Sequence, residues 1–172
     1  MGIPDQPVMA DRPRYGTRPF PAYRFLPGRT PHPRRNPQGH SFGLAEPHPL
    51  PFKHEDWSTS EDYLHAVDLY NFDYWWESHE VLEGLWHACG RKTQAGNFFQ
   101  ALIQFAAANL KHALGNDASA KNLARRGLVR LQKAPDHYMG LDTAAFADSV
   151  ALWLNNGNRS YMLIHLKLPG ER

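Results

Sequence analysis

The stretch that decides the fold is NFDYWWESHEVLEGLWH, residues 71–87. At about 100° per residue, an α-helix over these residues gathers apolar side chains on one face. Those are Tyr74, Trp75, Val81, Leu82 and Leu85. The opposite face mixes two indoles with ionisable groups: Trp76, His79, Glu80, Glu83, Trp86 and His87. Because a solvated face usually carries charges without large aromatics, we expect this helix to be covered on both sides.

Helix start and stop signals continue on both sides of this stretch. They predict helices from residues 58–62 to about Leu69, from Asn71 or Asp73 to Ala88, from Thr93 to 115–116, from Asp117 or Ser119 to about Lys133, and from Asp142 or Thr143 to about Asn155. Residues 160–168 are apolar enough to dock on this body, as a helix or as a strand. The predicted fold class is all-α, a compact bundle of about five helices over residues 53–172.

The N-terminal third has a different composition. Residues 1–52 hold twelve of the fourteen prolines, seven arginines, no lysine and three acids, which gives a net charge of 7 − 3 = +4. Residues 53–172 hold the other twelve cations and fourteen acids, which gives 12 − 14 = −2. Proline excludes helices and central strands, so we predict an extended or disordered Pro/Arg-rich arm, whose aromatics let part of it lie against the body.

The polar face of helix 71–87 carries the candidate chemistry. His79 and Glu83 are four residues apart, so they stack on neighbouring turns at a spacing that can supply two ligands to one metal ion. Glu80 flanks the same stripe as a further ligand or a catalytic general base. Imidazole and carboxylate suit zinc, manganese or iron. His112 on the next helix is the predicted outside metal ligand, with Gln104 as a pocket residue.

Two other uses of the same spacing stay open. A His–Glu pair at i, i+4 is more commonly a plain hydrogen-bonded pair, and metal-free acid–base chemistry is the third alternative. The string His79-Glu80-x-x-Glu83 is not the zinc protease motif, because that motif has a second histidine where this chain has Glu83. Hydrolysis by the protease mechanism is therefore not supported.

The pattern Trp76-Glu77-x-His79-Glu80-x-x-Glu83-x-x-Trp86 resembles the signature of the domain-of-unknown-function family numbered 309. The resemblance continues through residues 98–104 to Gly115-Asn116 and into residues 118–131, so it covers roughly residues 60–132. It implies a small, mostly helical bacterial or archaeal protein with no assigned reaction. The positions that match the pattern are Glu77, His79, Glu80, Glu83, Trp86, Gln104 and Asn116, of which Glu77, Trp86, Gln104 and Asn116 are our candidate pocket residues.

Composition excludes several classes of protein. No apolar run approaches the roughly 20 residues of a membrane span, and the N-terminus lacks the apolar core of a secretory signal. The single cysteine, Cys89, cannot form an internal disulfide, so we expect a cytoplasmic protein. The partners are unspecified: the net negative charge of the folded part disfavours nucleic acid, and a homo-oligomer stays open.

The sequence thus leaves two functions. The first is a helical domain with a His/Glu/Trp pocket that binds a divalent metal ion. The alternative is a non-enzymatic interaction module that uses the basic arm or the helix near residues 117–133, where Lys121, Arg125, Arg126, Arg130 and Lys133 lie. Whether the protein is an enzyme is undecided at this level.

Overall fold

The computed structural model describes residues 12–156 and 161–171. Its elements in chain order are the 3₁₀ helix η1 (His54–Thr59), α1 (Glu61–Asn71), α2 (Trp75–Ala88), α3 (Gln94–Ala113), α4 (Asp117–Leu131), β1 (His137–Tyr138), β2 (Leu141–Asp142) and α5 (Thr143–Asn156). The predicted all-α class is confirmed, and each helix lies within one to four residues of its predicted bounds.

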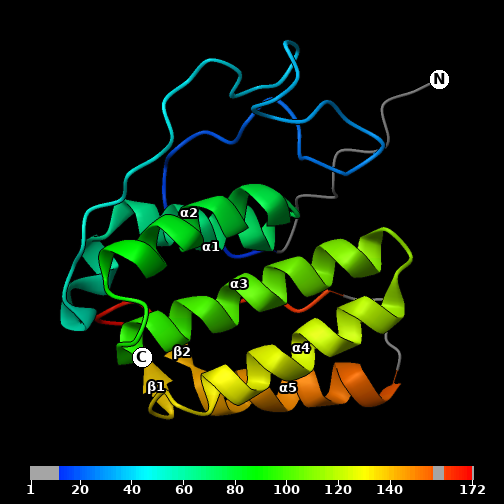
Figure 1. The fold of residues 1–172 in the computed structure, drawn as a ribbon. Coiled ribbons are helices and arrows are strands. Elements are labelled where there is room, and N and C mark those ends of the chain that lie inside the picture. The colour runs from blue at the N-terminus through cyan, green and yellow to red at the C-terminus, as the bar shows by residue number, and fades with distance from the viewer. Residues whose placement is uncertain (1–11, 157–160, 172) are drawn as a thin grey trace.

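Helices that follow one another in the chain pack against one another. α1 and α2 form one layer, α3 lies against α2, α4 lies against α3, and α5 lies next to α4 (Figure 1). Gly127 of α4 allows the close approach to α3, because a Cβ atom there would lie 2.5 Å from the ring of Phe105. This arrangement leaves one side of α1 and α2 for the N-terminal arm.

The helix starts follow the predicted caps in three cases. The side chains of Ser60, Thr93 and Asn116 accept hydrogen bonds from the backbone at the starts of α1, α3 and α4. The prediction that Asn71 or Asp73 caps α2 is wrong. The cap residue is Tyr74, whose side chain makes no cap hydrogen bond, because the Asp73 carboxylate binds the arm instead.

α1 is enclosed on all sides. Every residue from Tyr63 to Asn71 is buried, including the ionisable His65 and Asp68. An amphipathic surface helix would leave one face in water. The covering of α1 therefore comes from three directions: α2, the arm and the C-terminal segment.

The C-terminal segment, described from residue 161, is extended. Ile164 donates its N–H to Asn71 Oδ1 and accepts from Asn71 Nδ2, both at 2.8 Å, and Leu166 forms an isolated antiparallel bridge with Leu141. The sequence left helix or strand open for residues 160–168. The described part of this segment is an extended chain. The two-residue strands β1 and β2 and the helix η1 were not predicted, because such short elements have no sequence periodicity.

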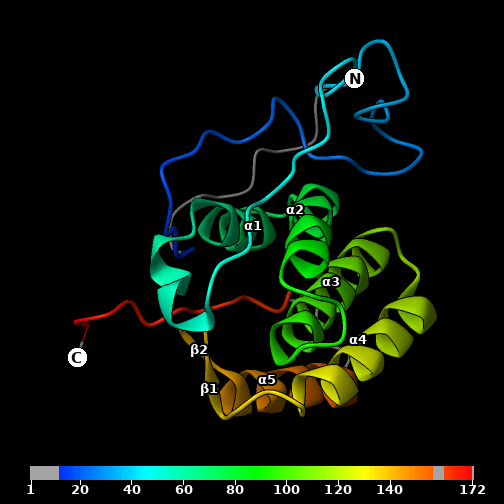
Figure 2. The same cartoon turned by 60° about the vertical axis from the view of Figure 1, so that its left-hand side comes forward.

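Residues 12–52 contain no helix or strand, as their prolines predict, and they run over α1 and α2 (Figures 1 and 2). Arginines of the arm meet helix acids: Arg12 and Arg24 bind Asp73, Arg14 lies near Asp68, Arg18 binds Asp62, and Arg34 lies near Glu80. The positive arm therefore lies on the negative helical part. The boundary at residue 52 between arm and bundle stays a prediction, and residues 1–11 lie outside the described part.

Among the residues that the structure describes, no helix is long and apolar enough to cross a bilayer.

Candidate functional site

The polar stripe of α2 brings three predicted residues together. His79, Glu80 and Glu83 each offer one metal-ligating atom, and these atoms all lie within 4.8 Å of one another. His79 Nδ1 lies 3.5 Å from a Glu80 oxygen, and His79 Nε2 lies 4.0 Å from a Glu83 oxygen. The helix itself produces this cluster, because residues three and four apart project from one side of adjacent turns. A His/Glu cluster that could hold a metal ion is therefore present.

The cluster is half-buried. The side chains of His79, Glu80 and Glu83 are 33%, 28% and 44% exposed, so they are open to solutes on one side. His79 Nδ1 is buried and has no hydrogen-bond partner within the described residues. When the ring is neutral, the lone pair of an unprotonated Nδ1 is therefore not engaged by another residue.

A groove of about 640 Å³ runs along this stripe. One wall is α2, with Glu80, Glu83 and His87, and the other is the arm segment 46–49. Pro49 is buried against Gly84, where a Cβ atom would lie 2.6 Å from the proline ring. The glycine thus allows the arm to approach α2 closely enough to form the second wall.

His87 extends the cluster by one turn. Its Nε2 lies 3.9 Å from Glu83, and its Nδ1 accepts a hydrogen bond from Arg91 at 2.9 Å. The sequence placed His87 on the polar face, but we did not predict it as a ligand.

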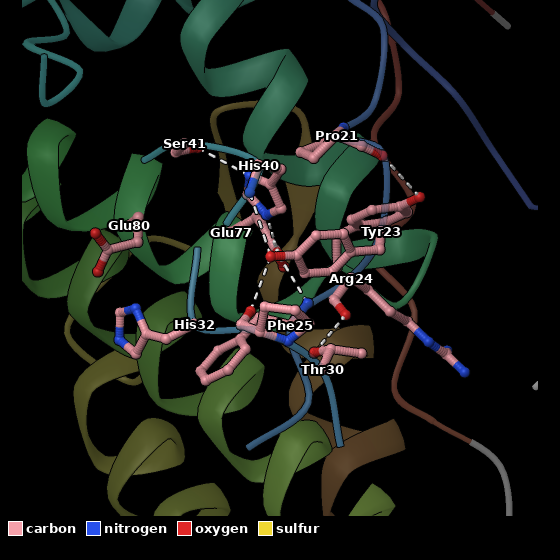
Figure 3. Close-up of polar contacts among 12 residues, drawn as sticks. Pro21, Tyr23, Arg24, Phe25, Thr30, His32, His40, Ser41, Glu77 and Glu80 are labelled. Carbon is pink, nitrogen blue, oxygen red and sulfur yellow. Dashed lines mark hydrogen bonds and ion pairs between the residues drawn. The ribbon is translucent and has the colours of Figure 1, made fainter. Parts of the chain in front are cut away.

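Glu77 belongs to a different environment, although it lies on the same helix. Its side chain is only 5% exposed. One oxygen accepts hydrogen bonds from the Phe25 backbone N–H at 2.8 Å and from His40 Nε2 at 3.0 Å, and the other oxygen has no partner. In Figure 3, Glu77 points toward His40 and Phe25, whereas the Glu80 carboxylate turns away from them. Glu77 therefore ties the arm to α2 and is not part of the metal-ligating cluster.

The remaining predicted site residues lie elsewhere. His112 binds Asp117 at 2.7 Å and packs against Trp153 and Tyr161, so the metal-ligating cluster of α2 does not include it. Asn116 caps α4. The sequence predicted that both His112 and Asn116 belong to the site on α2. That prediction required the end of α3 to lie beside the polar stripe of α2, and the spacing of residues within one helix does not determine how two helices are placed.

Trp86 and Gln104 are not part of the cluster. Trp86 donates its indole N–H to the Arg91 carbonyl at 3.3 Å, and the Arg91 guanidinium lies over its ring at 4.9 Å. Gln104 of α3 has a buried side-chain oxygen without a partner. Neither residue lines the groove beside Glu80 and Glu83.

Two buried acid–base groups of α1 lie under the arm. Burial lowers the pKa of His65 to about 4, with further lowering by Arg18 and Arg14. Burial also raises the pKa of Asp68, although the backbone N–H groups of Tyr15 and Gly16 donate to its carboxylate at 2.6 and 2.8 Å. The arm thus changes the electrostatics of α1 as well as covering it.

Sequence reasoning missed the contribution of the arm to the site. Arg34, His40 and the segment 46–49 all contact the polar side of α2. Two signals were available: the opposite net charges of the arm and the helical part, and the aromatics scattered along the arm. These two signals indicate that the arm attaches to the helical part, but they do not specify which arginine pairs with which carboxylate.

No curated protein matches this chain. A family model does match part of it, over α1, α2, α3 and the first half of α4, and this span includes the metal-ligating cluster. The predicted resemblance is confirmed at the level of the family: residues 63–123 match the family described as "Domain of unknown function (DUF309)".

Proposed function

We propose that this protein binds a divalent metal ion through His79, Glu80 and Glu83 on α2. The observation that supports the proposal is the convergence of one ligand atom from each residue within 4.8 Å. A tetrahedral zinc site needs ligand atoms at about 2.0–2.2 Å from the ion, so small rotamer changes of these half-exposed side chains suffice.

One imidazole nitrogen and two carboxylate oxygens suit zinc, and also manganese or ferrous iron. Three protein ligands leave a coordination position open, which is typical of reactive metal centres. His87 lies next to Glu83 along the groove, so it is the candidate for a fourth protein ligand in a geometry of five or six ligands, which still leaves a position open. Because His112 binds Asp117 instead, we leave it out of the ligand set.

Two of the three ligands, Glu80 and Glu83, line the groove of about 640 Å³, which is large enough for a small substrate beside the ion. A bound cation there acts as a Lewis acid on an oxygen-containing substrate or activates a water molecule. Within this proposal Glu80 has the role of a ligand rather than a general base, because a carboxylate bound to the ion is not free to take a proton.

Isothermal titration of tag-free, full-length protein with Zn²⁺ and with Mn²⁺ tests the proposal. We expect one saturable site whose affinity falls roughly tenfold or more in His79→Ala and in Glu83→Ala, which is at least about 1.4 kcal/mol of binding free energy. His54→Ala is the matched control, because His54 is exposed and lies next to a carboxylate on η1, away from α2. Equal affinities in the wild-type protein and His79→Ala would overturn the proposal.

A docking surface on α4 is the second candidate function. In the parts of the chain that are described, none of Lys121, Arg125, Arg126, Arg130 and Lys133 forms an ion pair, whereas five arm arginines lie within 4 Å of helix carboxylates. The interaction alternative therefore favours α4 over the arm. We expect the protein to bind immobilised polyglutamate at low salt, and Arg125→Gln with Arg126→Gln to remove that binding; unchanged retention would count against it.

A further inference from the structure

The Glu80 carboxylate has a different neighbour at each of its two oxygens. Oε1 lies 3.5 Å from His79 Nδ1, which belongs to the metal-ligating cluster, and Oε2 lies 3.8 Å from Nε of Arg34 in the arm. The side chains of Arg34 and Glu80 are only 20% and 28% exposed, so water and salt screen this ion pair incompletely. One carboxylate thus connects the metal-ligating cluster to the arm.

The fold of the arm holds Arg34 in this position. The His32 ring packs edge-to-face on Trp76 of α2, with the ring centroids 5.4 Å apart, and His32 Nδ1 accepts the backbone N–H of Arg34 at 3.2 Å. The Arg34 guanidinium also donates to the Leu44 carbonyl at 3.3 Å. Contacts of the arm, as well as the attraction of Glu80, therefore place this positive charge beside α2.

The charge of Arg34 opposes the binding of a cation by Glu80. A guanidinium carries only donors, so it cannot be a metal ligand. It neutralises part of the negative charge of Glu80, and it repels a second cation at the other oxygen of the same carboxylate. A metal ion about 2 Å from Oε1 would lie within roughly one Debye length, about 8 Å, of this guanidinium, so physiological salt does not remove the repulsion.

We propose that Arg34 sets the metal affinity of the site through Glu80. The arm holds the guanidinium against Glu80 and thereby lowers the affinity for a divalent cation, and a bound cation in turn loosens the arm around residues 32–44. This inference rests on the proposed metal site. Because linkage is reciprocal, the attached arm lowers the metal affinity by the same factor by which the metal weakens the attachment of the arm.

The first test is isothermal titration of the full-length protein with Mn²⁺. Arg34→Gln should bind Mn²⁺ roughly three- to tenfold more tightly than the wild type, because the repelling charge is removed. Arg34→Lys keeps the charge and should stay near the wild-type affinity. Arg35→Gln is the matched control, because Arg35 is the exposed neighbour of Arg34, and it should change the affinity by less than about twofold.

The direction of this effect separates it from a merely structural role. If Arg34 only supported the fold near Glu80, its replacement would weaken metal binding, and lysine would not restore the wild-type value. Thermal melting in metal-free buffer first confirms that each variant is folded.

The reciprocal test follows the arm itself. Trypsin should cleave the wild-type protein after Arg34 and Arg35 several-fold faster when Mn²⁺ saturates the site, as measured by mass spectrometry of the fragments. His79→Ala lacks a metal ligand, so the same Mn²⁺ concentration should leave its cleavage rate unchanged. This variant also controls for any effect of the metal on trypsin.

Failure of this inference is distinguishable from failure of the proposed metal site. An equal or weaker Mn²⁺ affinity in folded Arg34→Gln would overturn the role of Arg34 while the metal site stands. An Arg34→Lys protein that binds as tightly as Arg34→Gln, or a wild-type cleavage rate that bound Mn²⁺ does not change, would do the same. A wild-type protein that binds no metal ion would overturn both.

Discussion

At the scale of single residues, the two glutamates Glu77 and Glu83 show how burial assigns different tasks to one side-chain type on one helix. Glu83 is half-exposed beside two imidazoles, whereas Glu77 is almost fully buried and accepts two hydrogen bonds from the arm. A buried carboxylate without hydrogen-bond donors would destabilise the folded protein. The arm supplies the donors that Glu77 needs, and Glu77 in turn holds the arm on α2.

Replacement of Glu77 by alanine should therefore destabilise the protein. The substitution leaves the buried N–H of Phe25 without an acceptor, at a cost of about 1–3 kcal/mol. Urea denaturation in metal-free buffer measures the free energy of unfolding. Glu83→Ala, on the same helix, should change it by no more than about 0.5 kcal/mol. Similar losses in the two variants would contradict the assignment of Glu77 as the residue that attaches the arm.

His65 should make the protein sensitive to acid. Its pKa is about 4 in the folded protein, below the ordinary value of 6.5, so the unfolded chain binds a proton more readily between these two pH values. Stability contributed by neutral His65 is complete above pH 6.5 and is lost as the pH falls toward 4. Melting temperatures measured across this range should fall less steeply for His65→Asn than for the wild-type protein. The exposed His54→Asn should keep the wild-type slope.

At the scale of elements, the close pairing of α3 and α4 depends on a missing side chain. Ordinary core helices accept alanine at most positions, but a Cβ atom at position 127 would meet the ring of Phe105, which is fully buried in a close-packed core. The helix spacing here is thus decided by one glycine and one phenylalanine.

Gly127→Ala should lower the free energy of unfolding by about 1–3 kcal/mol through overpacking, even though alanine favours the helix itself by about 1 kcal/mol. Val129→Ala, on the exposed side of the same helix, should not destabilise the protein. Chemical denaturation of both variants checks the difference. A Gly127→Ala protein as stable as the wild type would show that Phe105 has room to shift.

At the scale of the whole molecule, the opposite charges of the arm and the helical part are matched within one chain. Arg12 and Arg24 converge on Asp73, at the junction of α1 and α2, and Asp73 has a positive φ of 71°. The side chain of Asp73 is buried, but the two guanidinium groups are partly exposed. Dissolved ions can therefore screen these two ion pairs, so we expect high salt to weaken them.

Asp73→Asn should loosen the arm while it keeps the backbone conformation, since asparagine also tolerates positive φ. We expect trypsin to cleave after the arm arginines several-fold faster in this variant. High salt should accelerate cleavage of the wild-type protein toward the same rate. Asp148→Asn, a change of an exposed acid of α5, is the control and should leave the rate unchanged. Equal cleavage of Asp73→Asn and wild-type protein would contradict an electrostatic attachment.

Much of this protein follows from local patterns in its sequence. The five α-helices end near their predicted residues, because capping side chains and 3.6-residue periodicity act within one or two turns. The cluster of His79, Glu80 and Glu83 was predictable for the same reason, since a single helix brings these residues together.

Contacts across long sequence separations were decided only by the tertiary structure. Phe25 meets Glu77 across 52 positions and Ile164 meets Asn71 across 93, and no periodic pattern encodes such pairings. His112 is the opposite case, a predicted contact that does not form. Its ring contacts Asp117 and Trp153 of α5 instead of the stripe on α2. Local sequence determined which helices form and which side chains share a turn. Packing decided which segments cover those helices, because such contacts depend on the shape and charge of surfaces that exist only after the chain has folded.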